Sequence, residues 1–140
     1  MLLTAGLIWV IARFAGGVEV AERMRCALGL GLIGLGAVLD LAGVVSCWRA
    51  STTINPLRPE STSALVTTGL FRFSRNPIYV GYFLVLSGWV LFLASPWSGF
   101  SLLLFVLYLH RFQIVPEERA LRETFGEEYD DYCARVRRWV

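Results

Sequence analysis

Two short motifs carry the side chains of this chain that could do chemistry. The first, R-N-P-x-Y-x-G at 75–81, places a guanidinium, an amide and a phenol within one helical turn of each other. The second, P-E-E at 116–118, adds two adjacent carboxylates. Together the motifs predict a polar site, whose candidate catalytic residues are Arg75, Asn76, Glu117 and Glu118.

A helical hairpin must bring these motifs together. Apolar runs at 78–94 and 100–115 flank the turn sequence SPWSG at 95–99, which is rich in turn-forming residues. Two helices joined by so short a turn pack antiparallel, so both motifs should lie at the same end of the hairpin. Each motif alone could be an ordinary helix start, with Pro in the first turn followed by acids or after Asn. Their combination favours a site.

Composition places the hairpin in a membrane. The chain has 140 residues, of which 56% are hydrophobic, and its mean hydropathy is +0.57. Long apolar runs with few charges are typical of membrane spans. We therefore predict one all-α integral membrane domain, 1–140, with about four transmembrane helices. The expected spans are 2–15, 27–48, 78–94 and 100–115.

Arginine placement predicts the orientation. With four spans, loop 49–77 and tail 116–140 lie on one side, and this side holds ten of the thirteen basic residues. Basic residues concentrate on the cytoplasmic side of membrane proteins. The loop and tail should therefore be cytoplasmic, and the expected location is a bacterial inner membrane. The ten residues are Arg49, Arg58, Arg72, Arg75, Arg111, Arg119, Arg122, Arg135, Arg137 and Arg138.

The tail is predicted to form an amphipathic helix, because its apolar residues recur every three or four positions on one face. Pro116 should end or kink the preceding span, and Gly126 could kink the tail. Glu118 and Arg122 are spaced as an i,i+4 ion pair. The tail could equally be a helix lying against the bundle or membrane surface. Its apolar face consists of Leu121, Phe125, Tyr129, Tyr132 and Val136.

Several other polar or small residues favour structural interpretations. Gly29, Gly31 and Gly34 match G-x-G-x-x-G, but this sequence lies in an apolar run with no preceding strand, so a dinucleotide site is disfavoured. With Gly36 and Gly43, these glycines should let helices approach closely, and they could support a homodimer. Asp40 should face the bundle, a polar partner or a cavity. No metal site and no nucleic-acid partner are expected. A metal site is not expected because the cysteines and the single histidine are scattered along the sequence, at Cys26, Cys47, Cys133 and His110.

Three segments of the chain resemble the isoprenylcysteine carboxyl methyltransferase and phospholipid N-methyltransferase superfamily. They are TTINP at 52–56, SALVTTGLFRFSRNPIYVG at 63–81 and PEERALRETFGEEYDDYCARV at 116–136. These segments occur in the family's order, with its hairpin between the last two. Residues 1–48 match only as generic spans.

The resemblance implies a methyltransferase that binds S-adenosylmethionine in a cytosolic pocket and methylates a lipid or small amphiphile. By position, the cofactor would contact nine residues of the loop and of the helix start after it, which are given at the end of this paragraph, and also Glu117 from the other helix of the hairpin. Glu117 or Glu118 could hold the cofactor's ammonium or ribose hydroxyls, and Arg75 its carboxylate. The nine residues are Ser63, Ala64, Leu65, Val66, Phe71, Asn76, Pro77, Ile78 and Tyr79.

The sequence departs from the family pattern at three positions. Asn76 replaces the histidine of Arg-His-Pro, and Phe71 replaces a tyrosine. Gln113 stands where an arginine would contact a prenylcysteine substrate, so Gln113 is the candidate substrate residue. Two alternatives stay open: a sterol-reductase-like enzyme using NADPH, and a non-enzymatic membrane scaffold or assembly factor.

Overall fold

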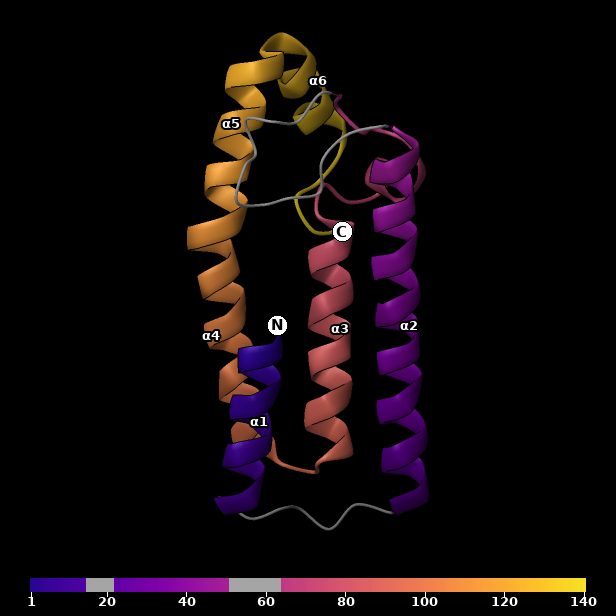
Figure 1. Cartoon of the computed structure of the whole chain (residues 1–140), viewed down its shortest axis with the longest axis vertical. Helices are drawn as coiled ribbons and strands as arrows, with labels where there is room; N and C mark the ends of the chain where they lie inside the picture. The colour runs from indigo at the N-terminus through magenta and orange to yellow at the C-terminus, as the bar shows by residue number, and fades with distance from the viewer. Residues whose placement is uncertain (15–21, 51–63) are drawn as a thin grey trace. The chain divides into compact units, whose positions relative to one another are not determined.

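The computed structural model describes residues 1–14, 22–50 and 64–140, and every regular element in those ranges is helical (Figure 1). The all-α prediction is confirmed for this part of the chain. A 3₁₀ turn (Gly69–Arg72) precedes α3, a second (Pro96–Ser98) precedes α4, and a π-helical segment (His110–Ile114) follows α4. The α-helices are α1 (Leu2–Phe14), α2 (Glu22–Arg49), α3 (Pro77–Phe92), α4 (Gly99–Leu109), α5 (Val115–Phe125) and α6 (Glu127–Arg135).

Two helices are longer than predicted. α2 begins at Glu22 rather than near residue 27, because its charged first turn, which includes Glu22, is helical too. The fourth predicted span continues without interruption to Phe125. Pro116 therefore does not end the helix. It lies in the first turn of α5, directly after the π-helical segment. Pro116 lacks an amide hydrogen, and its ring crowds the preceding turn. The wider π-helical turn gives the ring room, so the helix continues.

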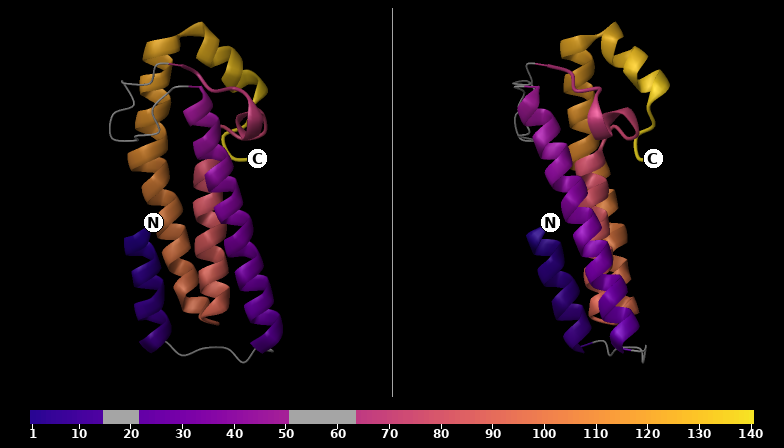
Figure 2. Two further views of the ribbon diagram at one scale, coloured as in Figure 1. Left: turned by 45° about the vertical axis from the view of Figure 1, so that its right-hand side comes forward. Right: turned by 90° about the vertical axis from the view of Figure 1, so that its right-hand side faces the viewer.

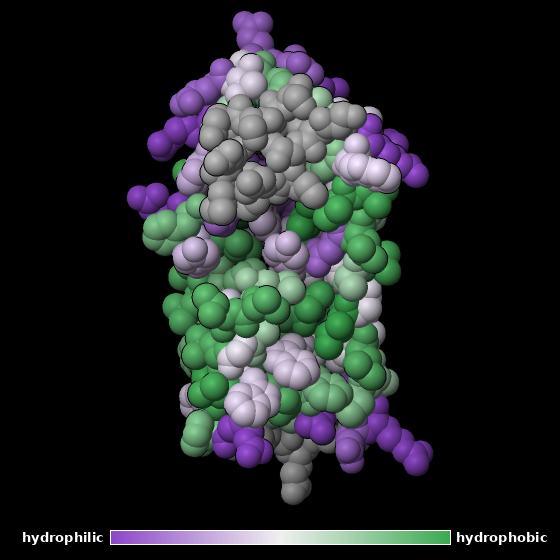
Figure 3. Space-filling model, in the orientation of Figure 1, coloured by the Kyte–Doolittle hydropathy of each residue, from purple (hydrophilic) through white to green (hydrophobic). Residues whose placement is uncertain are grey.

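The helices have the surface expected of membrane spans. Glu22–Arg49 and Pro96–Phe125 are long and apolar enough to cross a bilayer, whereas α1 and α3 are shorter apolar helices. In the most apolar windows of the two long helices, only 17% and 28% of residues are buried. Apolar side chains cover much of the visible face (Figure 3). Large exposed side chains include Leu28, Leu35, Val38, Leu103, Leu104 and Leu107.

The chain divides into two compact units, and the first comprises Met1–Val38 and Gly81–Leu107. Within it, α1 is held by side-chain hydrogen bonds: Trp89 Nε1 donates to the Ala5 carbonyl at 3.2 Å, and Ser98 Oγ donates to the Ile8 carbonyl at 3.0 Å. Ile8 is fully buried. Because these donors come from α3 and the turn before α4, α1 is anchored by both ends of the hairpin turn.

Close packing of α2 on α3 in this unit depends on glycine. A Cβ atom at Gly36 would lie 2.6 Å from the Gly81 carbonyl oxygen, and one at Gly88 would lie 2.5 Å from the Gly29 carbonyl oxygen. At Gly31 and Gly34, no atom of the described residues lies within 4 Å of that position. The predicted packing role is therefore confirmed for Gly29 and Gly36 and wrong for Gly31 and Gly34, whose hydrogens point into open space.

Gly36→Ala should lower the melting temperature of the detergent-solubilised protein, whereas Gly34→Ala should leave it nearly unchanged. The new methyl group at position 36 meets backbone atoms of α3, so the helices must separate, at a cost of about 1–3 kcal/mol. Thermal unfolding of the two variants side by side measures this difference. Equal melting temperatures would contradict the close approach of α2 and α3.

The second unit comprises Leu39–Val80 and Tyr108–Val140. Gly43 packs on Ile78 at the start of α3, since a Cβ at Gly43 would lie 2.5 Å from Ile78 Cγ1. Gly126, with φ of +53°, separates α5 from α6, so the predicted interruption is confirmed (Figure 2).

The five apolar tail residues pack in one cluster, but they lie on two helices and the residue after them. The predicted Glu118–Arg122 pair is replaced by Arg122 with Asp130 at 2.8 Å.

Candidate functional site

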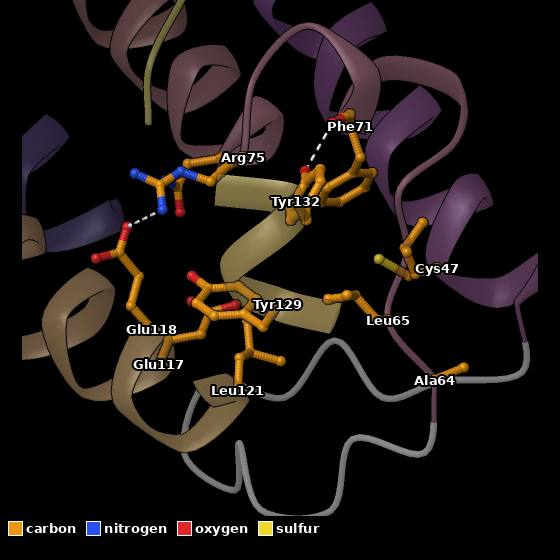
Figure 4. A pocket seen from close by; sticks show the side chains of 12 residues that line it. Cys47, Ala64, Leu65, Phe71, Arg75, Glu117, Glu118, Leu121, Tyr129 and Tyr132 are labelled. Atoms are coloured by element: carbon orange, nitrogen blue, oxygen red, sulfur yellow. Dashed lines mark hydrogen bonds and ion pairs between the residues drawn. The ribbon is translucent and has the colours of Figure 1, made fainter. Parts of the chain in front are cut away.

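A pocket in the second unit is lined by both predicted motifs (Figure 4). The space that it encloses, counted with its open mouth, is about 550 Å³. One wall comes from the segment before α3, and the opposite wall comes from α5 and α6. The lining residues are Cys47, Ala64, Leu65, Val66, Phe71, Arg75, Asn76, Glu117, Glu118, Leu121, Tyr129 and Tyr132.

Glu118 is held by two arginines. Arg138 donates from Nε to Glu118 Oε1 at 2.9 Å and from Nη2 to Oε2 at 2.6 Å. Arg75 Nη1 lies 3.4 Å from Glu118 Oε1, and the side chains of Arg75 and Glu118 are each 15% exposed. The hydrogen bonds to Glu118 raise the pKa of Arg138 above its usual range. This bidentate pairing is the stronger form of the arginine–carboxylate contact, so it fixes the carboxylate of Glu118.

Arg75 and Asn76 are also tied to the chain after α6. The Arg75 amide donates to the Arg137 carbonyl at 2.9 Å. Asn76 Nδ2 donates to the Arg138 carbonyl at 2.9 Å, and Ser74 Oγ donates to the same oxygen at 3.4 Å. These contacts join the loop that opens α3 to the C-terminal residues, although more than sixty residues separate them in sequence.

Glu117 has a different environment from its neighbour. The Tyr79 hydroxyl, from the first turn of α3, donates to Glu117 Oε2 at 3.0 Å. Neither arginine that pairs with Glu118 forms an ion pair with Glu117 among the described residues. Glu117 therefore lines the pocket as a carboxylate anchored by a neutral donor, and it keeps acceptor capacity for a ligand.

Aromatic side chains form another part of the pocket's wall. The Tyr132 hydroxyl donates to the Phe71 carbonyl at 2.6 Å (Figure 4). Burial raises the pKa of Tyr132 to about 12 and also raises that of Tyr129, so both hydroxyls stay neutral at physiological pH. Because the backbone bond fixes Tyr132, the Phe71 segment is held against α6.

The structure brings most of the predicted site residues together. Of the described ones, Pro77 and Ile78 do not line the pocket: Pro77 is buried at the start of α3, and Ile78 packs on Gly43. Tyr79 reaches the site through Glu117. Ser63 lies outside the described residues. Gln113 lies in the π-helical segment and is not among the lining residues, and its Oε1 is buried with no hydrogen-bond partner among the described residues. The predicted residues that line the pocket are Ala64, Leu65, Val66, Phe71, Arg75, Asn76, Glu117 and Glu118.

Sequence reasoning missed part of the wall. Cys47 comes from α2, where no pattern distinguished it from a generic span residue. The two tail tyrosines were assigned to an apolar face, and that periodicity was a signal that α6 folds onto something. Arg138 was read with the basic C-terminal residues, and nothing in the sequence paired it with Glu118. The missed residues are Cys47, Leu121, Tyr129 and Tyr132 in the pocket, and Cys133 and Arg138 behind it.

Comparison with known proteins gives a family match over most of the chain. A sequence model described as "Phospholipid methyltransferase" matches residues 24–128. The match begins inside α2, so the similarity extends further toward the N-terminus than the predicted limit at residue 52. No solved structure matches the chain.

Curated relatives agree with this match. Protein-S-isoprenylcysteine O-methyltransferase B of Arabidopsis thaliana is 31% identical over 77% of this chain and 55% of its own length. Protein-S-isoprenylcysteine O-methyltransferase of Saccharomyces cerevisiae is 32% identical over 84% and 49%, and its Homo sapiens namesake is 32% identical over 77% and 38%. The chain thus spans about half the length, or less, of these relatives. The expected resemblance is confirmed: the chain belongs to the phospholipid methyltransferase family.

Proposed function

We propose that this protein is an S-adenosylmethionine-dependent methyltransferase that acts on a lipid or small amphiphile at the cytosolic face of a membrane. The observation that carries the proposal is the pocket formed by the segment before α3 together with α5 and α6. It collects a guanidinium, an amide and a carboxylate next to aromatic rings, at the end of apolar helices. The family match supports methyl transfer as the reaction.

The residues present fit the cofactor's amino-acid end. S-adenosylmethionine carries an ammonium, a carboxylate and a sulfonium. Glu117 offers an anionic acceptor, and Arg75 Nε is buried with no acceptor among the described residues. An unsatisfied buried donor on a pocket-lining arginine suits a carboxylate ligand. We assign Glu117 to the ammonium or ribose hydroxyls and Arg75 to the carboxylate.

The chain's own residues would act by orientation and by exclusion of water. When bound, the cofactor supplies an electrophilic methyl group, whose transfer is an in-line displacement that depends on alignment. Phe71 and the two tail tyrosines surround the pocket with rings, which stabilise a neighbouring cation and exclude water. Asn76 keeps the loop in place through the Arg138 carbonyl. No proton-transfer step is assigned to Asn76, because an amide does not titrate.

The apolar helices support access of the acceptor from the membrane. In the proposed arrangement, α1 to α4 are four spans, the loop and tail are cytoplasmic, and the location is a bacterial inner membrane. The charged tail, which comprises α5 and α6, forms one wall of the pocket. Gln113 is proposed as a substrate-facing residue on the π-helical segment. Its amide replaces the arginine of the resemblance, so a carboxylate-bearing prenylcysteine is not the acceptor that we favour.

A homodimer through α2 is also part of the proposal.

Incubation of the purified protein with radiolabelled S-adenosylmethionine and a membrane lipid extract tests the proposal. We expect label to enter an organic-soluble product, whose identification gives the acceptor, and we expect S-adenosylhomocysteine to raise the melting temperature. Absence of labelled product together with stabilisation by NADPH would support a reductase instead. Absence of any effect of either cofactor would support a scaffold.

A further inference from the structure

The two adjacent carboxylates of the pocket are in different electrostatic states. Both oxygens of Glu118 accept hydrogen bonds from Arg138, and Arg75 lies 3.4 Å from one of them. The hydrogen bond to Glu117 comes from the neutral Tyr79 hydroxyl. The local charge of Glu118 is therefore balanced by two cations, whereas Glu117, whose pKa is raised by burial, has no paired cation among the described residues.

We infer that Arg138 is a positioning residue for this site. By holding both oxygens of Glu118, it keeps the second carboxylate from competing with Glu117 for the cationic end of the ligand, and it shares the charge of Glu118 with Arg75. Coulomb interactions at these distances are strong in a partly buried environment. The inference rests on the proposed function, and it adds a residue that the resemblance did not assign.

The backbone contacts of the same segment explain why Arg138 can do this. The carbonyls of Arg137 and Arg138 accept hydrogen bonds from the Arg75 amide and from Asn76 Nδ2. The main chain at 137–138 is thus anchored to the loop, while the Arg138 side chain reaches Glu118 on α5. One residue links the two pocket walls that carry Arg75 and Glu117.

The role is tested by measuring S-adenosylhomocysteine binding and the kinetics of methyl transfer to the lipid extract for four proteins. They are wild type, Arg138→Ala, Arg138→Lys and the control Arg137→Ala, whose side chain is exposed. Displacement of a binding group by about 1 Å can cost roughly 100-fold. We expect Arg138→Ala to raise the dissociation constant about 10- to 100-fold, with a larger effect on KM for the methyl donor than on kcat. Lysine keeps the charge but not the bidentate geometry, so it should fall between.

A rescue experiment separates positioning from general structural support. In Arg138→Ala, Glu118 is left with Arg75 alone. The added change Glu118→Gln removes that competing charge, and we expect it to recover part of the lost affinity. Unchanged binding in Arg138→Ala, or no recovery in the double variant, would overturn the inference. A wild-type protein that binds no S-adenosylhomocysteine would instead overturn the proposed function.

Discussion

Glu117→Ala should remove about half or more of the thermal stabilisation that S-adenosylhomocysteine gives to the wild-type protein. A ligand present at 100 times its dissociation constant stabilises a folded protein by about 2.7 kcal/mol. Loss of a hydrogen bond to a charged group costs roughly 1.5–3 kcal/mol, which corresponds to about a 10- to 150-fold weaker complex. Glu118 is a poor substitute in this role, because Arg138 and Arg75 already balance its charge. Differential scanning fluorimetry in detergent, with and without the ligand, measures the loss.

The matched control for this variant is Glu123→Ala. Glu123 lies on the same helix, α5, and is exposed. It should keep the full ligand-induced shift. Glu117→Ala without ligand also loses the hydrogen bond from Tyr79, worth roughly 1.5–3 kcal/mol, so the ligand-induced shift of each variant is compared and not its absolute melting temperature. A ligand-induced shift in Glu117→Ala equal to that of Glu123→Ala would exclude Glu117 from the binding site.

The helices could be predicted from the sequence because hydropathy and turn residues are local signals. The start of α2 and the end of the fourth helical stretch could not. Charged residues at Glu22 and Arg23 look like a turn in a hydropathy pattern, although they form a normal polar helix end. Pro116 looks like a helix terminus, but the π-helical segment before it lets the helix continue to Phe125. Such an accommodation depends on the three-dimensional path of the backbone.

The site was predictable to the extent that its residues lie in two contiguous motifs. Arg75, Asn76, Glu117 and Glu118 were brought together by one argument about an antiparallel hairpin, and all four line the pocket. The contribution of Arg138 depends on the turn at Gly126, which directs α6 and the residues after it back toward the loop. A sequence pattern gives the presence of that turn but not its direction. For the same reason, the sequence predicts that Glu118 pairs with Arg122 on the same helix, whereas in the structure it pairs with Arg138, which follows α6.

Asn76→Ala should lower both the melting temperature of the free protein and its affinity for S-adenosylhomocysteine, and this combination distinguishes it from Glu117→Ala. Asn76 is 8% exposed, and its amide donates to the Arg138 carbonyl at 2.9 Å. Alanine leaves that oxygen with the longer contact from Ser74. An under-satisfied buried polar group costs about 1–3 kcal/mol. Thr124→Ala, which removes an exposed hydroxyl bonded within α5, should change stability by less than about 0.5 kcal/mol.

The Asn76 and Arg138 variants should not be additive. Asn76 holds the main chain of residue 138, and Glu118 holds its side chain, so either change releases the same C-terminal segment. Residues that share one network have coupling energies of roughly 0.5–3 kcal/mol. We expect the double variant Asn76→Ala/Arg138→Ala to lose less stability than the sum of the single losses. Asn76→His supplies a ring N–H donor in place of the side-chain amide. Its stability should therefore stay closer to that of wild type than the stability of Asn76→Ala. Additive losses in the double variant would mean that the segment is not held as one unit, and that Asn76 acts on the pocket separately from Arg138.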